Sequence, residues 1–524
     1  MRRLLLLLLT LAMLLGGCAA WEDPDDIDLD NEWENYQPIP PETSEEEPDP
    51  EPEYPAAFSL PYHRDHTLDP VTCGEGIQET VASLLYEPLF RLNRTFQPEP
   101  LLCESWEWNE TGLVCTLNLR EGVAFSDGSS LTARDVVETL LRAKESERYA
   151  YRLRNVAGIT ANRAGQVLIT LTVPNQGLPA LLDIPIVKHT TASQPVPTGT
   201  GPYVFISDSG GDYLQAREDW WQGKTLPVQA IPLVHAKDRE TASFLFSSRR
   251  IELLTVDPTS APSLVTGKAQ TSSQPTSILQ FIGFNTAEGR LFSNATLRSL
   301  FSQGIDRETL VHAQLVQFAL AAQFPVSPLS NLYPSDLAKP YNKDSVLASL
   351  RLAGQDTGER KELTLLISAG DAFRATSARF IAEQLSLLDW RIEVVELPWD
   401  EYLTALEAGD FDLYFGEIRL TADWDLTDLL SIGAPLNYGG YANEATGQLL
   451  QEFSAATDRP AAARHLLAHL QSTAPIAPIC FKNYCVLTHS GVAEGISPAP
   501  SGVFYGLENW DIHLQVQAAK SQPD

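Results

Sequence analysis

An alternation of strand-like and helix-like segments between Glu362 and Gly416 constrains the fold of this chain more than any other feature. Apolar β-type runs and helical periodicities follow one another in the order strand, helix, strand, helix, strand: 363–368, 374–388, 392–397, 400–408 and 411–416. This succession predicts parallel strands joined by crossover helices, and therefore an α/β unit. Because ligands of such sheets bind beyond the carboxyl ends of the strands, we expect a site at the loops after Ser368, Leu397 and Gly416.

Turn and capping residues predict two further elements. The apolar-alternating runs 104–108 and 113–120 are joined by Asn-Glu-Thr-Gly, which predicts a β-hairpin. Thr132 and Asp135 have the spacing of a capping box, and apolar residues then recur at helical spacing, which predicts a helix over 133–144. The glycine-rich segment 198–202 precedes a strand-like run, so we expect a turn there and no phosphate-binding loop.

The amino-terminal residues are typical of a secretory signal peptide, which we place at 1–17. Arg2 and Arg3 precede an apolar run over 4–15, which is too short for the roughly 20 residues that cross a bilayer as a helix. The run ends in Leu-Gly-Gly-Cys, which is similar to a bacterial lipobox and implies acylation of Cys18. An ordinary signal peptide with a chance cysteine at its end is the alternative.

Acidic residues are concentrated directly after this segment. The chain has 37 Lys+Arg against 68 Asp+Glu, a formal net charge of −31, and residues 21–53 hold 15 acidic residues and no basic one. This balance argues against a protein that binds nucleic acid by neutralising phosphates. The proline-rich stretch 18–54 cannot bury enough apolar surface to fold, so we expect an extended tether, with an acidic metal-binding tail as the alternative. The remaining length suits two or three globular units.

Five cysteines follow Cys18, so at least one thiol is expected to stay unpaired. Export permits disulfides. Two pairs flank the predicted hairpin and an expected short turn at 481–484, and pairing within each stays open: Cys103 with Cys115, and Cys480 with Cys485; the fifth cysteine is Cys73. No Cys-x-x-Cys motif occurs, which argues against a zinc ribbon and a thioredoxin-type site.

Histidine spacing and motif searches give no indication of an enzyme. His465 and His469, like His63 and His66, are interpreted as surface residues because no acid accompanies them as in a zinc protease. The motifs of zinc proteases, α/β-hydrolases and P-loop enzymes are absent from the sequence. We therefore expect no catalytic residues, no metal and no cofactor.

A series of short motifs follows one order along the chain, from about Leu68 to Gly491. The matching segments are 68–70 (Leu-Asp-Pro), 85–89 (Leu-Tyr-Glu-Pro-Leu), 100–106, 119–128 with 131–136, 199–203 (Gly-Thr-Gly-Pro-Tyr), 281–286 and 304–308 (Gly-Ile-Asp-Arg-Glu). Together they resemble the extracellular solute-binding proteins of ABC importers, in particular the family that binds oligopeptides, dipeptides and nickel chelates. Cys103 and Gly304 stand where that family has alanine.

The resemblance implies an α/β fold of the type II periplasmic-binding class, with two lobes around a hinged cleft and an extra subdomain. The implied boundaries are 55–70, 181–254 and 475–524 for the discontinuous first lobe, 71–180 for its subdomain, and 255–474 for the second lobe. Two connecting strands are expected to form the hinge, and a ligand held by both lobes stabilises the closed form.

The resemblance also implies a ligand-binding residue. Peptide-binding members pair the peptide's amino terminus with an aspartate of the second lobe, and Asp423 stands at the equivalent loop, with Trp424 as a neighbouring wall. A buried carboxylate needs a cationic partner, so an ammonium group suits it; a solvated acidic loop is the alternative. The family's Gly-Trp pair is replaced here by Gly416 and Glu417, so we expect a pocket of different shape.

Three residues are weaker ligand candidates. Trp399 follows the strand 392–397 and is expected either to stack on a ligand or to belong to the core. Arg374 or Arg379 is expected to meet a ligand carboxylate, although neither aligns with the anchoring arginine of dipeptide binders.

Together these features predict a lipid-anchored extracytoplasmic protein that captures peptides and delivers them to the permease and ATPase subunits of an ABC importer. We expect a monomer that reaches the membrane through the lipid on Cys18 and binds no nucleic acid. The alternatives are a nickel chelate or an oligosaccharide as the solute, or a ligand sensor without transport. The small number of histidines near the expected cleft weakens the nickel alternative.

Overall fold

The computed structural model describes residues 54–515, except for 75, 164, 260–263, 265–268, 315–317, 354–360 and 387–389. The predicted signal peptide, Cys18 and the predicted tether up to residue 53 lie outside the described residues. Within the described part, no helix has the length and apolar character needed to span a membrane. First lobe, subdomain and second lobe denote the ranges predicted from the sequence, and the boundaries of these ranges stay a prediction.

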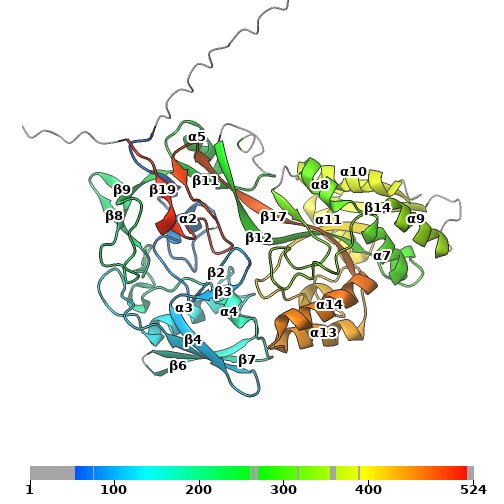
Figure 1. The fold of residues 1–524 in the computed structure, drawn as a ribbon, viewed down its shortest axis with the longest axis horizontal. Coiled ribbons are helices and arrows are strands. Elements are labelled where there is room, and N and C mark those ends of the chain that lie inside the picture. The colour runs from blue at the N-terminus through cyan, green and yellow to red at the C-terminus, as the bar shows by residue number, and fades with distance from the viewer. Residues whose placement is uncertain are drawn as a thin grey trace, which may run out of the picture. The chain divides into compact units, whose positions relative to one another are not determined.

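The largest sheet contains the predicted α/β unit (Figure 1). Its strands follow the order β11-β17-β12-β16-β14-β15, and β13 pairs with β17. β14 pairs in parallel with both β15 and β16, so the predicted strand and helix succession is confirmed. Helix α11 begins at Trp399, one residue before the predicted start at residue 400. The bounds are β11 (Leu253–Val256), β12 (Ala269–Phe284), β13 (Ala319–Ala321), β14 (Lys361–Ser368), α10 (Ala372–Ser386), β15 (Trp390–Leu397), α11 (Trp399–Ala408), β16 (Leu413–Arg419) and β17 (Ile476–His489).

Side chains of this sheet alternate between two separate cores. Leu365 and Phe415 pack on one face with helices α7 to α10, whereas Leu366 and Tyr414 pack on the other face with helices α11 to α14. Helices on both faces are typical of parallel α/β sheets, whose strands are buried on both sides. The remaining helices of this region are α7 (Ala295–Gln303), α8 (Arg307–Gln314), α9 (Lys343–Leu352), α12 (Thr427–Leu430), α13 (Glu444–Ala455) and α14 (Arg459–Thr473), with a 3₁₀ turn at Leu291–Ser293.

The subdomain is built on a four-stranded sheet of order β4-β5-β7-β6. The predicted hairpin is confirmed as β4 and β5, and the predicted helix as α3, which begins with the capping box of Thr132 and Asp135. The bounds are β2 (Phe90–Leu92), β3 (Pro98–Pro100), β4 (Cys103–Trp108), β5 (Val114–Leu119), α3 (Ala133–Glu145), β6 (Val156–Arg163), β7 (Gln166–Leu171) and α4 (Leu178–Leu181).

A third sheet, of order β1-β10-β9-β8, forms the core of the first lobe. The segment 198–202 leads into β8 as predicted. A Cβ on Gly199 or Gly201 would lie 2.1 or 2.5 Å from backbone atoms of Leu85, so these glycines permit close packing of two chain segments. The bounds are β1 (Leu60–Tyr62), α2 (Ile77–Ala82), a 3₁₀ turn (His189–Thr191), β8 (Tyr203–Asp208), β9 (Gly211–Ala216), β10 (Ala230–His235), α5 (Arg239–Ser247), β18 (Ala493–Glu494), a second 3₁₀ turn (Leu507–Asn509) and β19 (Asp511–Ile512).

Two long strands, β12 and β17, connect these regions. They pair along almost their whole lengths, yet Phe481 of β17 belongs to a core of the largest sheet and Val486 to the core of the first lobe. Between these two cores the register shifts, and the Thr276 hydroxyl donates a hydrogen bond to the Lys482 carbonyl at 2.5 Å. The pairing of β12 with β17 is therefore irregular at the position between the two cores.

The expected turn at 481–484 is wrong, because Cys480 and Cys485 lie on one continuous strand, β17. Their thiols belong to different cores. The other proposed pair also fails, since Cys103 stands opposite Leu119 in the hairpin and not opposite Cys115. All five cysteines of the described chain are free and buried, and burial raises the pKa of Cys103 and of Cys115 to about 12.

Candidate ligand-binding cleft

A cavity of 420 Å³ lies where the connecting strands meet residues of both lobes and of the subdomain. Its volume is within the range of small-molecule sites, which are usually a few hundred Å³. Its walls come from segments far apart in the sequence: 76–83, 239–243, 254–257, 274–277, 419–422 and 500–503. Such a cavity can form only once the whole body has folded.

Charged residues of both signs line the cavity. Arg148 forms an ion pair with Glu79, and Arg152 forms one with Asp183 at 2.5 Å. Because each arginine is paired with one carboxylate, the charges of this part of the wall are balanced. The paired groups still present polar atoms to a ligand. Both arginines lie in the subdomain range.

Unpaired polar groups line the cavity as well. Arg239 and Glu240 begin α5 and have no ion-pair partner among the described residues. The Thr255 hydroxyl is buried without a hydrogen-bond partner. A ligand with both an anionic and a cationic end could pair with the exposed Arg239 and Glu240 and supply a partner to the buried Thr255 hydroxyl.

A buried lysine lies beside the cavity. The Lys482 ammonium group contacts Asp257 at 3.0 Å and Glu417 at 3.5 Å, and its side chain is 4% exposed. Burial opposes its charged form, but the two carboxylates outweigh burial and raise the pKa of Lys482. Because Asp257 also lines the cavity, this cluster joins the connecting strand β17 to the cavity wall.

Arg374 extends the same cluster. Its guanidinium group donates to the Ser368 hydroxyl and lies 3.6 Å from Asp371 and 3.9 Å from Glu417. Strand β16 runs to Arg419, past its predicted end at Gly416, so Glu417 is a strand residue. Of the three loops that the sheet argument named, only the one after β16 contributes to the cavity wall. Arg374 itself does not line the cavity.

The structure does not bring Arg379 and Trp399 to the cavity. Arg379 is largely exposed on α10, 3.9 Å from Glu396. Trp399 begins α11, is 59% exposed and stacks on Tyr402. Their roles as ligand contacts stay predictions.

Asp423 is buried and follows Ala422, a residue of the cavity wall, but it does not itself line the 420 Å³ cavity; it lines a separate space of 10 Å³ together with Asn175. Its carboxylate accepts hydrogen bonds from the Thr421 hydroxyl at 2.5 Å and from the Asn175 amide at 2.8 Å. An ionised carboxylate offers about four acceptor sites, so about two remain for another donor. No lysine or arginine makes an ion pair with this carboxylate in the described part of the chain; the Arg459 guanidinium group instead donates to the Asp423 carbonyl.

Trp424 is a core residue rather than an open wall. It is 1% exposed and packs between Phe96 and Phe481, with ring centroids 5.0 and 5.6 Å away. Its backbone has a φ of 60°, which is costly for a bulky side chain and is held only by surrounding packing.

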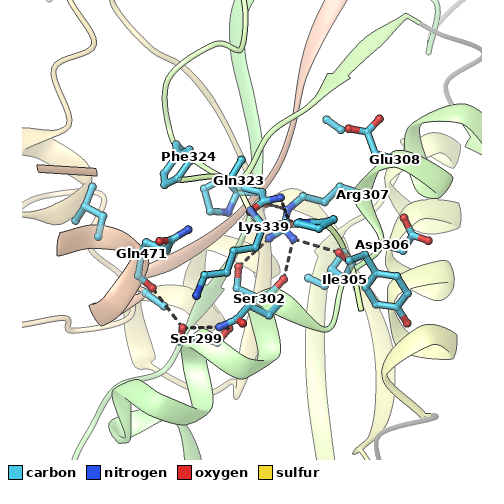
Figure 2. A pocket seen from close by; sticks show the side chains of 18 of the residues that line it. Ser299, Ser302, Ile305, Asp306, Arg307, Glu308, Gln323, Phe324, Lys339 and Gln471 are labelled. Carbon is cyan, nitrogen blue, oxygen red and sulfur yellow. Dashed lines mark hydrogen bonds between the residues drawn. The ribbon is translucent and has the colours of Figure 1, made fainter. Parts of the chain in front are cut away.

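A second and larger cavity, of 730 Å³, lies in the second lobe beside α7, α8 and α14 (Figure 2). Arg307 lies at its wall, but its guanidinium group already donates to the carbonyls of Pro478, Ser302 and Ile305 and to the Ser302 hydroxyl. Burial lowers the pKa of Arg307 to about 10. These bonds brace the end of α7 against β17, so little donor capacity is left for an anion.

The histidine pairs form no metal site. His469 contacts the Thr446 hydroxyl at 2.8 Å, and His63 stacks on His66. Among the described residues no group of three histidine, cysteine, aspartate or glutamate side chains could hold a metal ion.

Sequence comparison identifies the family. Residues 97–440 match the model of the bacterial extracellular solute-binding proteins, family 5 Middle. The chain belongs to this family. Its members are ABC solute-binding proteins and not enzymes, so the expectation that this chain is not an enzyme is confirmed. The family also places the protein outside the cytoplasm.

Relatives of known structure agree with the family assignment. The oligopeptide-binding protein AppA of Bacillus subtilis is 24% identical over 483 residues, which cover 82% of this chain and 86% of the relative. The unliganded open form of the murein tripeptide binding protein MppA aligns with a TM-score of 0.74 at 18% identity, covering 88% of this chain and 99% of that one. NikZ from Campylobacter jejuni, in complex with Ni(L-His), aligns with a TM-score of 0.61 at 17% identity, covering 88% and 99%. The predicted two-lobe fold is thus confirmed.

Several residues around this family 5 cleft carried no signal in the sequence. Arg239 and Glu240 belong to no motif, and Asn175 follows β7 in an ordinary polar loop. Asn175 reaches Asp423 across 248 positions of sequence. Only an alignment of related sequences or a structure could have identified such a pair.

Proposed function

We propose that this family 5 protein captures peptides in the 420 Å³ cavity and delivers them to an ABC permease with its ATPase subunits. The observation that carries the proposal is a small polar cavity with unpaired groups of both charge signs, and a buried carboxylate one residue beyond its wall. A peptide carries an ammonium group at one end and a carboxylate at the other, and its backbone supplies donors and acceptors between them.

In this proposal Asp423 receives the ammonium group of the peptide. Its carboxylate keeps free acceptor sites while Thr421 and Asn175 fix its orientation. Arg239, without an ion-pair partner among the described residues, receives the carboxylate end. Trp424 supports Asp423 from the core.

The earlier candidates Arg374, Arg379 and Trp399 have weaker support. None of them lines the cavity or adjoins a residue that does, whereas Asp423 follows Ala422 of the wall. Arg374 acts in this proposal through Glu417, by holding the cluster around Lys482.

The proposed protein is a monomer that a lipid on Cys18 holds at the outer face of a membrane. The acidic, proline-rich stretch 18–54 separates the body from the membrane surface. The connecting strands β12 and β17 serve as the hinge, because their pairing is irregular where they pass between cores.

The experiment that tests the peptide proposal is mass spectrometry of the small molecules released when the purified full chain is denatured. Short peptides of mixed sequence are the expected result, and their lengths define the accepted range. A nickel chelate, such as the Ni(L-His) bound in the NikZ structure, or an oligosaccharide in place of peptides would overturn the proposal. If nothing is released, calorimetric titration with a mixture of di- to pentapeptides decides, and absence of binding would also overturn it.

A further inference from the structure

The subdomain grips a short segment of the second lobe beside the cleft. Arg154 spans two carboxylates: it lies 2.6 Å from Asp425 and also pairs with Asp428. All three side chains are only 23–26% exposed, and the guanidinium group lies 4.4 Å from the ring centroid of Tyr151. An arginine that bridges two half-buried carboxylates is held more firmly than a surface ion pair.

Hydrogen bonds continue this contact on both sides. The side-chain carbonyl of Asn175 accepts from the Gly177 amide, which aims the Asn175 amide at Asp423. The Gln176 backbone amide donates to the Ser454 carbonyl at 2.8 Å. In Figure 1 the chain beyond β7 accordingly lies beside α13.

An apolar contact crosses the same boundary. Phe96, at the turn between β2 and β3, is 4% exposed and belongs to a core cluster of the second lobe. Its ring meets Trp424, and both residues have left-handed backbone, with φ of 61° and 60°. A left-handed backbone is costly for an aromatic residue, so packing across this boundary must hold both residues in this conformation.

Gly177 is the point of closest approach. A Cβ at this position would lie 1.9 Å from the Arg459 guanidinium group and 2.6 Å from the Asp423 Cβ. Its φ of −80° is open to any residue, so glycine is required by the neighbouring lobe and not by its own backbone.

We propose that these contacts form a latch, comprising Phe96, Arg154, Asn175 and Gly177 of the subdomain against residues 423–428 and Arg459, that holds the subdomain against the second lobe in the ligand-free protein. Contacts made only in one of two arrangements shift the equilibrium toward that arrangement. The latch thus sets the proportion of the ligand-free protein that has this arrangement. It also links this arrangement to ligand recognition, because Asn175 orients the Asp423 carboxylate only while the subdomain contacts the second lobe. The latch goes beyond the proposed function, since it concerns the ligand-free protein whatever its solute.

Gly177→Ala is the sharpest test, because the added methyl group fits the local backbone but collides with the second lobe. Hydrogen–deuterium exchange of the ligand-free full chain should become about ten-fold faster, or more, in peptides covering 172–180 and 421–430, as expected from lost close packing. The matched control is Gly158→Ala in β6, where a Cβ has no atom within 4 Å. It should leave exchange in both peptides unchanged.

Arg154→Ala tests the same latch by removing charge instead of adding bulk. We again expect exchange about ten-fold faster in those two peptides. Its control is Arg91→Ala, which removes a comparable arginine: Arg91 is 30% exposed, pairs with Glu99 and lies 4.4 Å from the ring centroid of Tyr505, and both of these partners lie outside the second-lobe range. Both variants should lose similar thermal stability, but only Arg154→Ala should loosen the latch peptides.

Unchanged exchange in both test variants overturns the latch, as does equal acceleration in the test and control variants. If Gly177→Ala accelerates exchange throughout the body, including β12 and β17, it has unfolded the protein and the Arg154 pair decides. Should Arg154→Ala also unfold the protein, the double variant Asp425→Asn and Asp428→Asn, which keeps side-chain size, replaces it with the same expected outcome.

Discussion

At the scale of single residues, Glu252 shows how burial makes stability depend on pH. It is 3% exposed, and its carboxylate accepts a hydrogen bond from the Ser59 amide at 2.7 Å. Burial outweighs this bond and raises the pKa of Glu252 to about 7 from an ordinary value of 4.5. The folded state therefore holds the proton more tightly than the unfolded state, and the stability that Glu252 contributes falls as pH rises from 4.5 to about 7.

Glu252→Gln should remove this dependence, because the amide oxygen still accepts from Ser59 and carries no charge. At pH 8 we expect the variant to be more stable than the native protein by about 3 kcal/mol, and by little at pH 4.5. Thermal unfolding at several pH values measures the difference, with Glu110→Gln at an exposed position as control. An advantage that does not change between pH 4.5 and 8 would show that Glu252 is not the titrating group.

Asp423 allows a test of the peptide proposal at the same scale. Asp423→Asn keeps the size of the side chain but removes the charge that an ammonium group would meet. We expect peptides with a free amino terminus to lose about ten-fold or more in affinity, and amino-terminally acetylated peptides to change little. Calorimetric titration of both peptide types into both proteins distinguishes this from an effect on closure, which would weaken the two types equally.

At the scale of elements, the largest sheet requires glycine on β12. Gly283 stands opposite Tyr414 on β16, and a Cβ there would lie 2.0 Å from the Tyr414 ring. Gly283→Ala must therefore displace a ring in a packed core, which should cost about 1–3 kcal/mol of unfolding free energy. Denaturant unfolding compares it with Gly158→Ala, which meets no atom, and equal midpoints would contradict the packing argument.

The elements also show where sequence patterns succeed and fail. The helix over 374–388 and the hairpin of β4 and β5 follow from local periodicity and turn residues, which their own segments contain. The strand β17 does not, because Lys482 and Asn483 suggest a turn although both are buried. Asp257 and Glu417, far away in the sequence, neutralise Lys482 in the strand interior. Long-range pairing overrode local composition, as it commonly does in strands.

At the scale of the whole molecule, the sequence indicates the general position of the site but not its walls. The sheet rule and the family resemblance both pointed to the loop of Asp423, which lies beside the cavity. The place of Arg239 in the cavity wall, and of Asn175 beside Asp423, depends on how lobes that fold from distant segments meet. Trp399 illustrates the limit, since an aromatic residue after a predicted strand became an exposed residue of α11.

The proposed membrane anchor concerns the whole molecule, because the proposed lipid site at Cys18 and the folded body are different parts of the chain. The body buries its apolar residues in cores of its own, so attachment should depend on Cys18 alone. Two or more acyl chains, at about 0.8 kcal/mol for each buried CH₂ group, hold a protein firmly, whereas the acidic tether is repelled by anionic lipid.

Cys18→Ala should therefore move the protein from the membrane fraction to the medium or periplasm, with unchanged peptide binding. Cys73→Ala, at a buried thiol of the first-lobe core, is the control that should stay in the membrane fraction. If the Cys18 variant also remains there, the lipid anchor is wrong and another part of the chain must hold the membrane.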